Sequence, residues 1–230
     1  MSKTAPQCIG FIMDGNRRWA KDQNKPTLTG HKKGFDVFID SVRFIRDKEI
    51  PNAVYYAFST ENWQRSKEEV EYLMDLFKQM IDNLTNKILK EEKPVKIRFV
   101  GRRSDLSDEL QAEIEKLEAM NDDNADAKTT IWVALSYGGR VEIIEAVNQA
   151  VGQGRAVTEE SFKKLLWTAQ MPDPDIIVRT SGEHRLSNFM TWGSVYSELY
   201  FIDKHWPALT ESDFEDILDE YEKRDRRCGK

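Results

Sequence analysis

Cysteine is scarce in this chain, and the cysteines lie far apart. Only two of the 230 residues are cysteine, Cys8 and Cys228, near opposite ends of the sequence. This spacing argues against a disulfide framework. With three histidines it also offers no pattern typical of a structural zinc site. We therefore expect the fold to rest on a hydrophobic core, which a hydrophobic content of 40% supports.

Long apolar runs are missing as well. No stretch is long enough to cross a bilayer, and no cleavable leader is expected. The formal charge of −6 argues against a dedicated nucleic-acid binder. We therefore expect a cytoplasmic protein that does not bind nucleic acid, and contact with a membrane surface remains open.

Three common catalytic signatures are also absent, because the chain has no G-x-x-x-x-G-K-[ST], G-x-G-x-x-G or G-x-S-x-G pattern. Short apolar runs instead alternate with segments whose apolar residues recur at helical spacing. The runs expected to be strands are Cys8–Met13, Ala53–Phe58, Val95–Val100, Thr130–Leu135 and Ile176–Val178, with Glu198–Ile202 as a further candidate.

Helix starts can be read between these runs. Ser66 and Glu69 have the form of a capping box before a long helix, Thr158 caps a short one, and Thr210 and Asp213 open the last. This alternation predicts one α/β domain over residues 1–230, with a mostly parallel central sheet flanked by helices.

Polar segments follow the predicted strands at their carboxyl ends, where parallel sheets bind ligands. The most informative contains Arg179, Arg185 and Ser187, because guanidinium groups suit the oxygens of a diphosphate. We read the segments as one shared site. They are Asp14–Trp19, Ser59–Arg65, Gly101–Arg103, Tyr137–Arg140 and Arg179–Ser187.

Each segment also has a plainer interpretation. Asp14-Gly15 is a common turn pair, and Trp63 is typical of a buried loop anchor. A tight strand-to-helix turn is the interpretation we favour for Tyr137–Gly139, and a lone histidine such as His31 is more often structural.

Several segments taken together resemble one family. Phe11–Ala20, Gly30–His31, Tyr56–Arg65, Arg179–Asn188 and Glu198–Phe201 occur in the order seen in the cis-prenyltransferases, the family of undecaprenyl diphosphate synthase. The resemblance spans nearly the whole chain. It implies a parallel sheet with a hydrophobic tunnel, a homodimer, and extension of an allylic diphosphate such as farnesyl diphosphate by isopentenyl diphosphate. The product would be a cis-polyprenyl diphosphate that passes to the membrane.

The resemblance also implies roles for individual residues. Asp14 would be catalytic and bind Mg²⁺, with Glu198 as a second metal ligand, donated across the dimer interface in one alternative. Asn62 would act when a proton leaves after carbon–carbon bond formation. Substrates would be bound by Gly15, Asn16, Arg17, Arg18, Trp19, His31, Ser59, Thr60, Glu61, Trp63, Arg65, Arg179, Arg185, Leu186 and Ser187.

Some positions depart from the family pattern. Cys8 replaces a usual histidine, and Thr27 replaces a basic residue that helps to bind the allylic diphosphate, a loss that Arg17 would offset. Trp132 and Leu135 would shorten the tunnel if they point inward, so product length stays undecided.

Other interpretations were weighed against this one. Asp122, Asp123 and Asp126 fit the D-D-x-x-D pattern of the all-helical trans-prenyltransferases, but one copy between a predicted helix and a strand indicates a surface loop. A non-catalytic partner subunit is the main alternative. It typically lacks the first aspartate or the phosphate-binding arginines, which this chain has. A simple phosphate-binding module would not account for Asp14 and Asn62.

Overall fold

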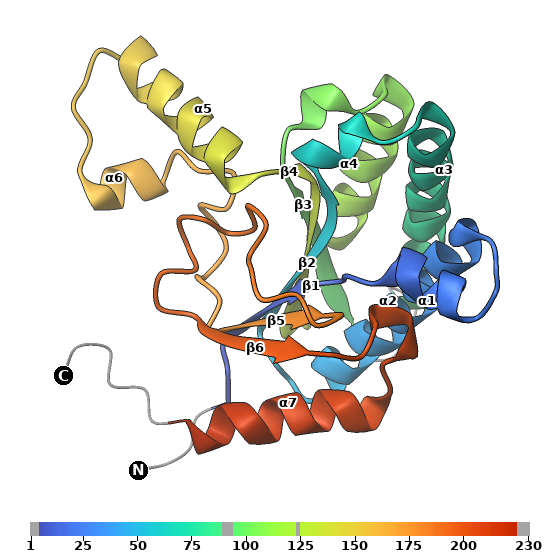
Figure 1. Ribbon diagram of the computed structural model, residues 1–230. Coiled ribbons are helices and arrows are strands. Elements are labelled where there is room, and N and C mark those ends of the chain that lie inside the picture. The colour runs from blue at the N-terminus through green and yellow to red at the C-terminus, as the bar shows by residue number, and fades with distance from the viewer. Residues whose placement is uncertain (1–4, 89–93, 123–124, 225–230) are drawn as a thin grey trace.

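Six parallel strands form one sheet in the computed structural model, which describes residues 5–88, 94–122 and 125–224 (Figure 1). The strand order is β3-β4-β2-β1-β5-β6, and every neighbouring pair is parallel. All six predicted strands are confirmed, and the sheet is parallel throughout. They are β1 (Cys8–Ile12), β2 (Asn52–Ser59), β3 (Val95–Val100), β4 (Thr129–Tyr137), β5 (Ile176–Thr180) and β6 (Glu198–Ile202).

The sheet lies between layers that bury both of its faces. Residues of β1 and β5 are buried throughout, as expected for parallel strands covered on two sides. Helices α2, α3, α4 and α7 pack on one face, and α5 and α6 lie on the other side in Figure 1. The α-helices are α1 (Asn16–Asp22), α2 (Thr27–Asp47), α3 (Lys67–Asn83), α4 (Asp108–Asp122), α5 (Gly139–Gly152), α6 (Glu159–Lys163) and α7 (Glu211–Lys223).

The core on the α2–α3 face is built from alternate strand residues. Phe11, Tyr55 and Val133 face this side and pack with Phe38 of α2 and Phe77 of α3. The opposite face carries a second cluster with Trp132, Phe189 and Met190. Trp132 therefore points away from α2 and α3, because successive side chains of a strand alternate between faces.

Two of the predicted helix starts are confirmed and one is only half right. The pairs Thr158–Ser161 and Thr210–Asp213 form complete capping boxes. Ser66 caps α3 by accepting from the N–H of Glu69 at 3.3 Å. The Glu69 carboxylate does not return the bond, because it pairs with Arg65 at 3.0 Å instead.

Helix α1 was not expected from the sequence. It has seven residues and only Ala20 is buried, so it carries no apolar periodicity of its own. Several shorter helical turns complete the chain: η1 (Thr60–Gln64), the π-helical η2 (Leu84–Ile88), η3 (Arg103–Asp105) and η4 (Trp206–Ala208). Over the described ranges, every helix is too short or too polar to cross a bilayer.

Candidate active site

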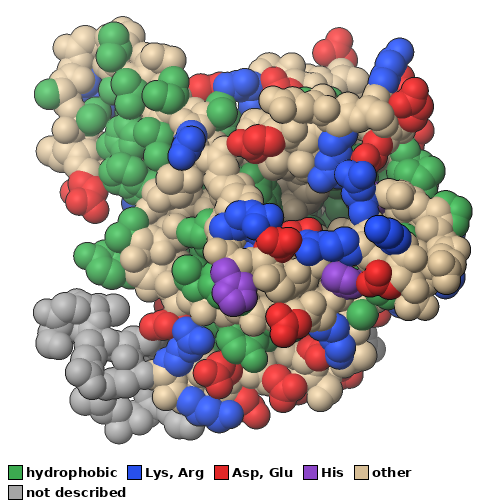
Figure 2. Space-filling view, viewed as in Figure 1, with side chains coloured by type: hydrophobic (Ala, Val, Ile, Leu, Met, Phe, Trp, Pro, Cys, Tyr) green, Lys and Arg blue, Asp and Glu red, His purple; other side chains and the backbone are tan. Residues whose placement is uncertain are grey.

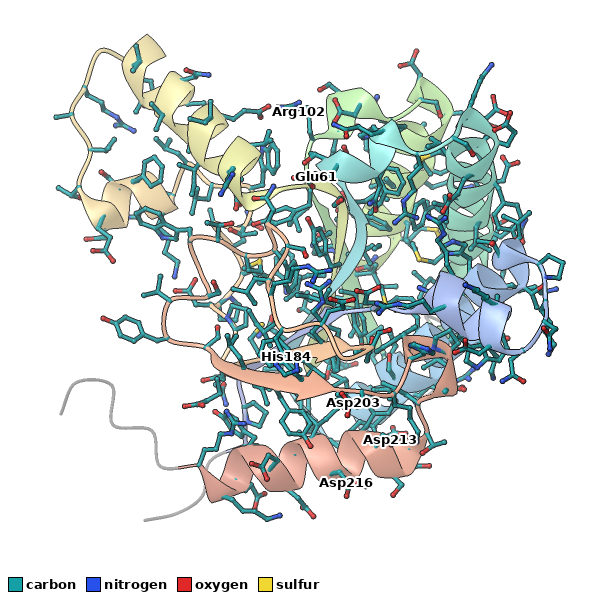
Figure 3. The ribbon with its side chains drawn as sticks, in the orientation of Figure 1. Glu61, Arg102, His184, Asp203, Asp213 and Asp216 are labelled. Carbon is teal, nitrogen blue, oxygen red and sulfur yellow. The ribbon has the colours of Figure 1, made fainter. Side chains whose placement is uncertain are left out.

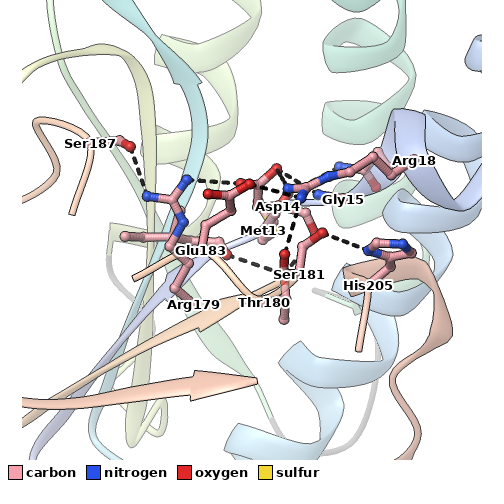
Figure 4. A network of polar contacts seen from close by, with 12 residues as sticks. Met13, Asp14, Gly15, Arg18, Arg179, Thr180, Ser181, Glu183, Ser187 and His205 are labelled. Carbon is pink, nitrogen blue, oxygen red and sulfur yellow. Dashed lines mark hydrogen bonds and ion pairs between the residues drawn. The ribbon is translucent and has the colours of Figure 1, made fainter. Parts of the chain in front are cut away.

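Strands β1 and β5 end side by side, and the residues that follow them meet. Ile12 pairs with Arg179 in the sheet register, so Asp14 lies next to the end of β5. Nη2 of Arg179 donates to Oδ2 of Asp14 at 2.8 Å (Figure 4). Residues 165 positions apart thus share one polar centre at the carboxyl edge of the sheet.

Arg179 is the buried hub of this centre, with a side chain 4% exposed. Its Nη1 donates to the hydroxyl of Ser187 at 2.7 Å and to the carbonyl of Arg185. Its Nε is buried without a hydrogen-bond partner. Arg179 therefore holds the segment up to Ser187 through Nη1. Because buried donors are rarely left unpaired, its Nε is a candidate donor for a ligand.

Arg18 approaches the same centre from α1. Its Nη2 lies 3.2 Å from Oδ1 of Asp14, and its Nη1 donates to the carbonyl of Ser181 at 3.1 Å and to Glu183 at 2.9 Å. The other oxygen of Glu183 pairs with Arg185. Two carboxylates therefore gather three arginines, an arrangement suited to phosphate oxygens.

The surroundings of Asp14 keep its carboxyl ionised. Burial alone would raise its pKa. The hydrogen bond and charge of Arg179, the N–H of Gly15 and the charge of Arg18 outweigh burial, so the pKa lies below its ordinary value. Asp14 is therefore a negative charge at neutral pH.

Two pockets meet beside Asp14. The polar pocket is lined by Asp14 together with the cations Arg17, Arg18, Lys21, Lys25 and Arg65. Figure 2 shows Lys and Arg side chains near the middle of the face, around a hollow. The apolar pocket lies between α2, α3 and the sheet and is lined by Phe35, Phe38, Leu73, Phe77, Met80 and Val133, among others.

The two pockets share Met13, Asn16 and His31. Nε2 of His31 is buried without a hydrogen-bond partner, 3.6 Å from Glu69, and Oδ1 of Asn16 is also unpartnered. Burial and the charge of Arg65 lower the pKa of His31 below its ordinary value, although Glu69 acts in the opposite direction. His31 is thus a neutral imidazole with a ring nitrogen at the junction of the two pockets.

The segment that carries Asn62 forms the short helix η1 after β2. Oδ1 of Asn62 accepts from the N–H of Ser59 at 3.1 Å, so Asn62 caps its own turn. Thr60 donates to Glu61, and Glu61 accepts from Asn188 at 2.7 Å. A further pocket is lined by Ser59, Glu61 and Asn62 on one side and by Leu186 and Ser187 on the other.

A magnesium ion can be tested against these donors. Among the described residues, no group of three or more His, Cys, Asp and Glu side chains is arranged to hold a metal ion. Mg²⁺ needs fewer protein ligands, because it often binds one or two carboxylates together with substrate phosphates and water. The Asp14 carboxylate can accept about four hydrogen bonds or metal bonds, and Gly15 and Arg179 occupy two of these positions. Asp14 therefore fits as a single carboxylate ligand.

A family described as putative undecaprenyl diphosphate synthase has a sequence model that matches residues 12–229. The chain belongs to this family. An isoprenyl transferase of Thermotoga maritima is 43% identical over 229 residues, which cover 97% of both chains. One of Fusobacterium nucleatum is 41% identical over 232 residues, covering 100% of this chain and 98% of that one. The family expected from the sequence is confirmed, and prenyl chain elongation is supported as its type of reaction.

Solved structures agree with this assignment. Lavandulyl diphosphate synthase from Lavandula x intermedia, in complex with dimethylallyl diphosphate, superposes with a TM-score of 0.89. It is 30% identical and covers 98% of this chain and 99% of its own. A probable undecaprenyl diphosphate synthase from Campylobacter jejuni has a TM-score of 0.82 and 29% identity, covering 99% and 100%.

Glu198 lies away from Asp14 in this prenyltransferase chain. Glu198 begins β6 opposite Ile176, whereas Arg179, which holds Asp14, pairs with Phe201. Three residues of strand correspond to about 10 Å, so Glu198 lies toward the amino edge of the sheet. Its carboxylate accepts from Arg224 at 2.8 Å. Asp14 and Glu198 therefore share no site within one chain.

Four other side chains of the expected site segments have partners within the protein. Trp63 donates to Ser136 at 2.8 Å and Trp19 lies beneath Lys25, so both rings have protein partners. Arg102 pairs with Glu145 and Arg103 with Glu118. Arg102 lies far from His184 of the Arg179–Ser187 segment in Figure 3. Arg102 nevertheless lines a small pocket with Thr60 and Trp63, so the end of β3 lies beside the Ser59–Arg65 segment.

The turn after β4 has the structural role that we favoured. Its Tyr137 donates to the buried carboxylate of Glu142 at 2.6 Å.

Two residues of the site lie in the Arg179–Asn188 segment but were assigned no role from the sequence. Thr180 donates to the carbonyl of Asp14 at 2.7 Å and so fixes the end of β1. Asn188 donates to Glu61 and accepts from the N–H of Arg140 at 2.8 Å. Asn188 has a φ of +66°, a conformation that asparagine adopts more readily than most residues. The asparagine itself is therefore the signal that the sequence offers at this position.

Proposed function

We propose that this protein is a magnesium-dependent cis-prenyltransferase that extends an allylic diphosphate with isopentenyl diphosphate. The observation that carries the proposal is the junction of a cationic pocket with an apolar pocket at Met13, Asn16 and His31. An allylic diphosphate has the same division into a charged head and an apolar tail. Ligand pockets of this kind combine an apolar lining with a few placed polar groups.

The allylic diphosphate would lie in the polar pocket beside Asp14. Gly15, Asn16 and Arg18 line it, and the unpartnered nitrogen of His31 supplies a donor. Arg17 and Thr27 line this same pocket, which supports a role for Arg17 in offsetting Thr27. The lavandulyl diphosphate synthase structure holds dimethylallyl diphosphate, which favours an allylic ligand in this fold.

Isopentenyl diphosphate would bind the neighbouring segment through Arg179, Arg185 and Ser187. Arg185 is 60% exposed and its guanidinium is available to a ligand, and Nε of Arg179 lacks a partner. The Asp14–Arg179 contact lies between this position and the polar pocket, so both diphosphates would meet at one charged centre. Holding two reactants in this way removes much of the entropic cost of their encounter.

Magnesium would be held by Asp14 and by oxygens of the allylic diphosphate. It would supply the charge that stabilises the departing diphosphate. Arg18 and the N–H groups after Asp14 would donate to the same group, since donors aimed at developing charge lower the barrier.

Proton removal would complete each condensation. Asn62 is a neutral amide and a poor base, so we assign it the orientation of substrate or water. Its amide nitrogen has the freedom to do so, because only its oxygen is bound to Ser59. The proton would pass to a diphosphate oxygen or to Asp14.

A homodimer belongs to the same proposal. Helix α5 exposes Ile144, Val147 and Val151, and the loop before β6 exposes Val195 and Tyr196 at 72% and 79%. Apolar side chains gather over α5 at the upper left of Figure 2. Contiguous exposed apolar surface is typical of an interface. A second copy there could present its Glu198 to Asp14 and complete the metal site.

The proposed location follows from the chemistry of the product. A cis-polyprenyl diphosphate, such as undecaprenyl diphosphate, carries a long apolar chain, so we propose a cytoplasmic enzyme that passes its product to the membrane. The apolar pocket would open into a tunnel that shelters the chain during growth.

The test is direct synthesis. The protein is incubated with Mg²⁺, labelled isopentenyl diphosphate and, in turn, dimethylallyl, geranyl, farnesyl and geranylgeranyl diphosphate, and the extracted products are separated by chromatography. We expect elongation of at least one primer and loss of elongation with a chelator. A folded protein that extends none of them would contradict the proposal and favour the partner-subunit alternative.

A further inference from the structure

A serine, a histidine and an aspartate form a chain of hydrogen bonds beneath the Asp14 segment. Oγ of Ser181 lies 2.6 Å from Nδ1 of His205, and Nε2 of His205 lies 3.1 Å from Oδ2 of Asp22 (Figure 4 shows the Ser181–His205 contact). Ser181 follows β5, Asp22 ends α1, and His205 precedes η4. The chain therefore joins three elements that lie far apart in the sequence.

The direction of these bonds follows from the donors available. A carboxylate only accepts, so Nε2 of His205 carries the hydrogen that Asp22 receives. In the neutral imidazole Nδ1 is then an acceptor, and the hydroxyl of Ser181 donates to it. All three groups are satisfied in this arrangement.

The residue types are those of a hydrolase triad, but the setting is different. Ser181 is 5% exposed and is absent from the residues that line the polar pocket. Its Oγ is turned toward Gly15 and His205. The chain of bonds is therefore suited to holding backbone in place.

Gly15 is the part of the backbone that the network touches. A Cβ built on Gly15 would lie 2.6 Å from Oγ of Ser181 and 2.7 Å from Nδ1 of His205. Gly15 has a φ of +99° and connects Asp14 to α1, the helix that carries Arg17 and Arg18. The network thus packs against the turn that aims the cationic side chains of the polar pocket.

Other contacts fix the same turn from the same side. The N–H of Trp206 donates to the carbonyl of Asp14 at 3.0 Å, and the carbonyl of Ser181 accepts from Arg18 at 3.1 Å. Ser181 itself has a φ of +80°, a conformation that costs a non-glycine residue free energy. Such strain persists where surrounding contacts over-determine it, and it often accompanies function.

We propose that Ser181, His205 and Asp22 are positioning residues that hold the Asp14–Arg18 turn and α1 in the geometry that binds the allylic diphosphate. The inference rests on the proposed function for the identity of that ligand. It assigns a role to three side chains that contact neither substrate. Loss of the network should weaken binding of the allylic diphosphate alone. Isopentenyl diphosphate would bind Arg179, Arg185 and Ser187, which are held by their own hydrogen bonds.

The experiment measures two affinities in the same variants. Farnesyl diphosphate with Mg²⁺ is titrated calorimetrically without isopentenyl diphosphate, and the KM for isopentenyl diphosphate is measured separately. Asp22→Ala, His205→Ala and Ser181→Ala are expected to weaken farnesyl diphosphate binding by about 5-fold or more, the scale of one or two lost hydrogen bonds. The KM for isopentenyl diphosphate should change by less than about 2-fold.

Two controls separate positioning from general stability. Asp22→Asn keeps an acceptor for Nε2 of His205 and should restore binding relative to Asp22→Ala. Asp22 has a side chain 59% exposed, so both of its variants are expected to fold. Ser41→Ala removes another buried serine hydroxyl, one bonded to Tyr55 and to the carbonyl of Phe38 and not among the atoms nearest Gly15, and should change neither affinity.

The outcomes are distinct. Loss of farnesyl diphosphate affinity with an unchanged KM for isopentenyl diphosphate supports the network. If the wild-type protein binds without elongating, the proposed reaction alone is overturned, and a calorimetric loss in the alanine variants that Asp22→Asn restores and that Ser41→Ala does not show still supports the network. Unchanged affinity in all three alanine variants, or equal loss for both substrates, overturns the network while leaving an elongating enzyme intact. A wild-type protein that neither binds nor extends an allylic diphosphate overturns both.

Discussion

Single side chains decide which charges the site carries. Asp14 is placed between Arg18 and Arg179, and these partners keep it ionised against the effect of burial. The carboxylate thereby joins the Asp14–Arg18 turn to the Arg179–Ser187 segment. Its removal should therefore affect chemistry more than folding.

Asp14→Ala is expected to lower kcat by about 10³-fold, the scale of losing a group that stabilises transition-state charge. Asp14→Asn should lose nearly as much, because it carries no charge and its one amide oxygen replaces only one of the two oxygens that accept from Gly15 and Arg179. Steady-state kinetics at saturating Mg²⁺ would measure both, with circular dichroism to verify folding. Asp126→Asn, in the rejected D-D-x-x-D segment, should leave kcat unchanged, and near-normal turnover of Asp14→Asn would refute the role of the charge.

The pKa of Glu142 is shifted in the opposite direction from that of Asp14. It is 1% exposed and accepts from Tyr137 and from the N–H and hydroxyl of Thr168. Burial raises its pKa above the ordinary value, although these hydrogen bonds act against the shift. Because the folded pKa is raised, its stabilising contribution is fully present below the unfolded pKa of about 4.5 and is lost as pH rises through the folded pKa.

Glu142→Gln should therefore gain stability relative to wild type as pH rises from about 4 to 8. The glutamine keeps an acceptor for Thr168 and presents an amide to Tyr137, but it does not ionise. Urea unfolding of both proteins across this range would measure the difference. A constant or falling difference would contradict the shift. Glu142→Ala should cost about 2–4 kcal/mol near pH 4, because it leaves buried partners unsatisfied, and the cost should fall as pH rises because alanine does not ionise either.

Whole elements reveal what a sequence pattern can and cannot predict. The spacing of apolar residues on α5 predicts a helix, yet Ile144 and Val147 are exposed while Glu142, Ala146 and Ala150 are buried. Periodicity defines two faces, but contacts elsewhere in the fold decide which face is covered. An apolar face left open by its own chain is the natural place for a second copy.

Ile144→Glu is expected to weaken self-association by about 100-fold or more, because an unpaired carboxylate is costly to bury. Sedimentation equilibrium would give the dissociation constants. If Glu198 acts across the interface, turnover should fall in parallel and recover at high protein concentration. Met120→Glu is the matched control, since Met120 is 57% exposed on α4 and belongs to no proposed interface. Equal effects of the two variants would argue against an interface at α5.

The sheet was predictable because its strands are buried apolar runs. The meeting of Asp14 with Arg179 was predictable because both follow or end strands of a parallel sheet. What escaped the sequence depends on contacts between distant residues. Helix α1 is short and is held by Gly15 and His205. Glu198 was recognised as part of a motif, but the start of a strand and its end lie at opposite edges of the sheet. The contacts of His205 with Ser181 and Asp22 could be identified only from the structure, because the three residues lie far apart in the sequence.

At the scale of the whole molecule, the two faces of the sheet pack against different parts of the chain. One face packs against α2 and α3 and encloses the apolar pocket, whereas the other carries Trp132 among the loops before β6. Trp132 therefore cannot narrow the pocket, and Leu135 is not among its lining residues. On the proposed function, the limits to a growing chain would come from α2 and α3 instead.

Met80 is the best candidate for the floor of the proposed tunnel. Helix α3 begins beside the polar pocket, where Glu69 contacts Arg65, and Met80 lies eleven residues or about 16 Å farther along the helix. Met80 is 4% exposed and lines the apolar pocket. Met80→Ala should therefore lengthen the pocket at the end remote from the diphosphate, and the longest product should grow by about one isoprene unit.

Product chromatography after exhaustive elongation would measure this change. Met74→Ala is the matched control, because it makes the same substitution on the same helix at a residue that packs on the core but does not line the pocket. Both variants should lose stability, Met80→Ala by about 2–5 kcal/mol, so both are assayed well below their unfolding temperatures. Equal product lengths for Met80→Ala and Met74→Ala would mean that the chain grows along another path. A longer product from Met80→Ala alone would locate that path between α3 and the sheet.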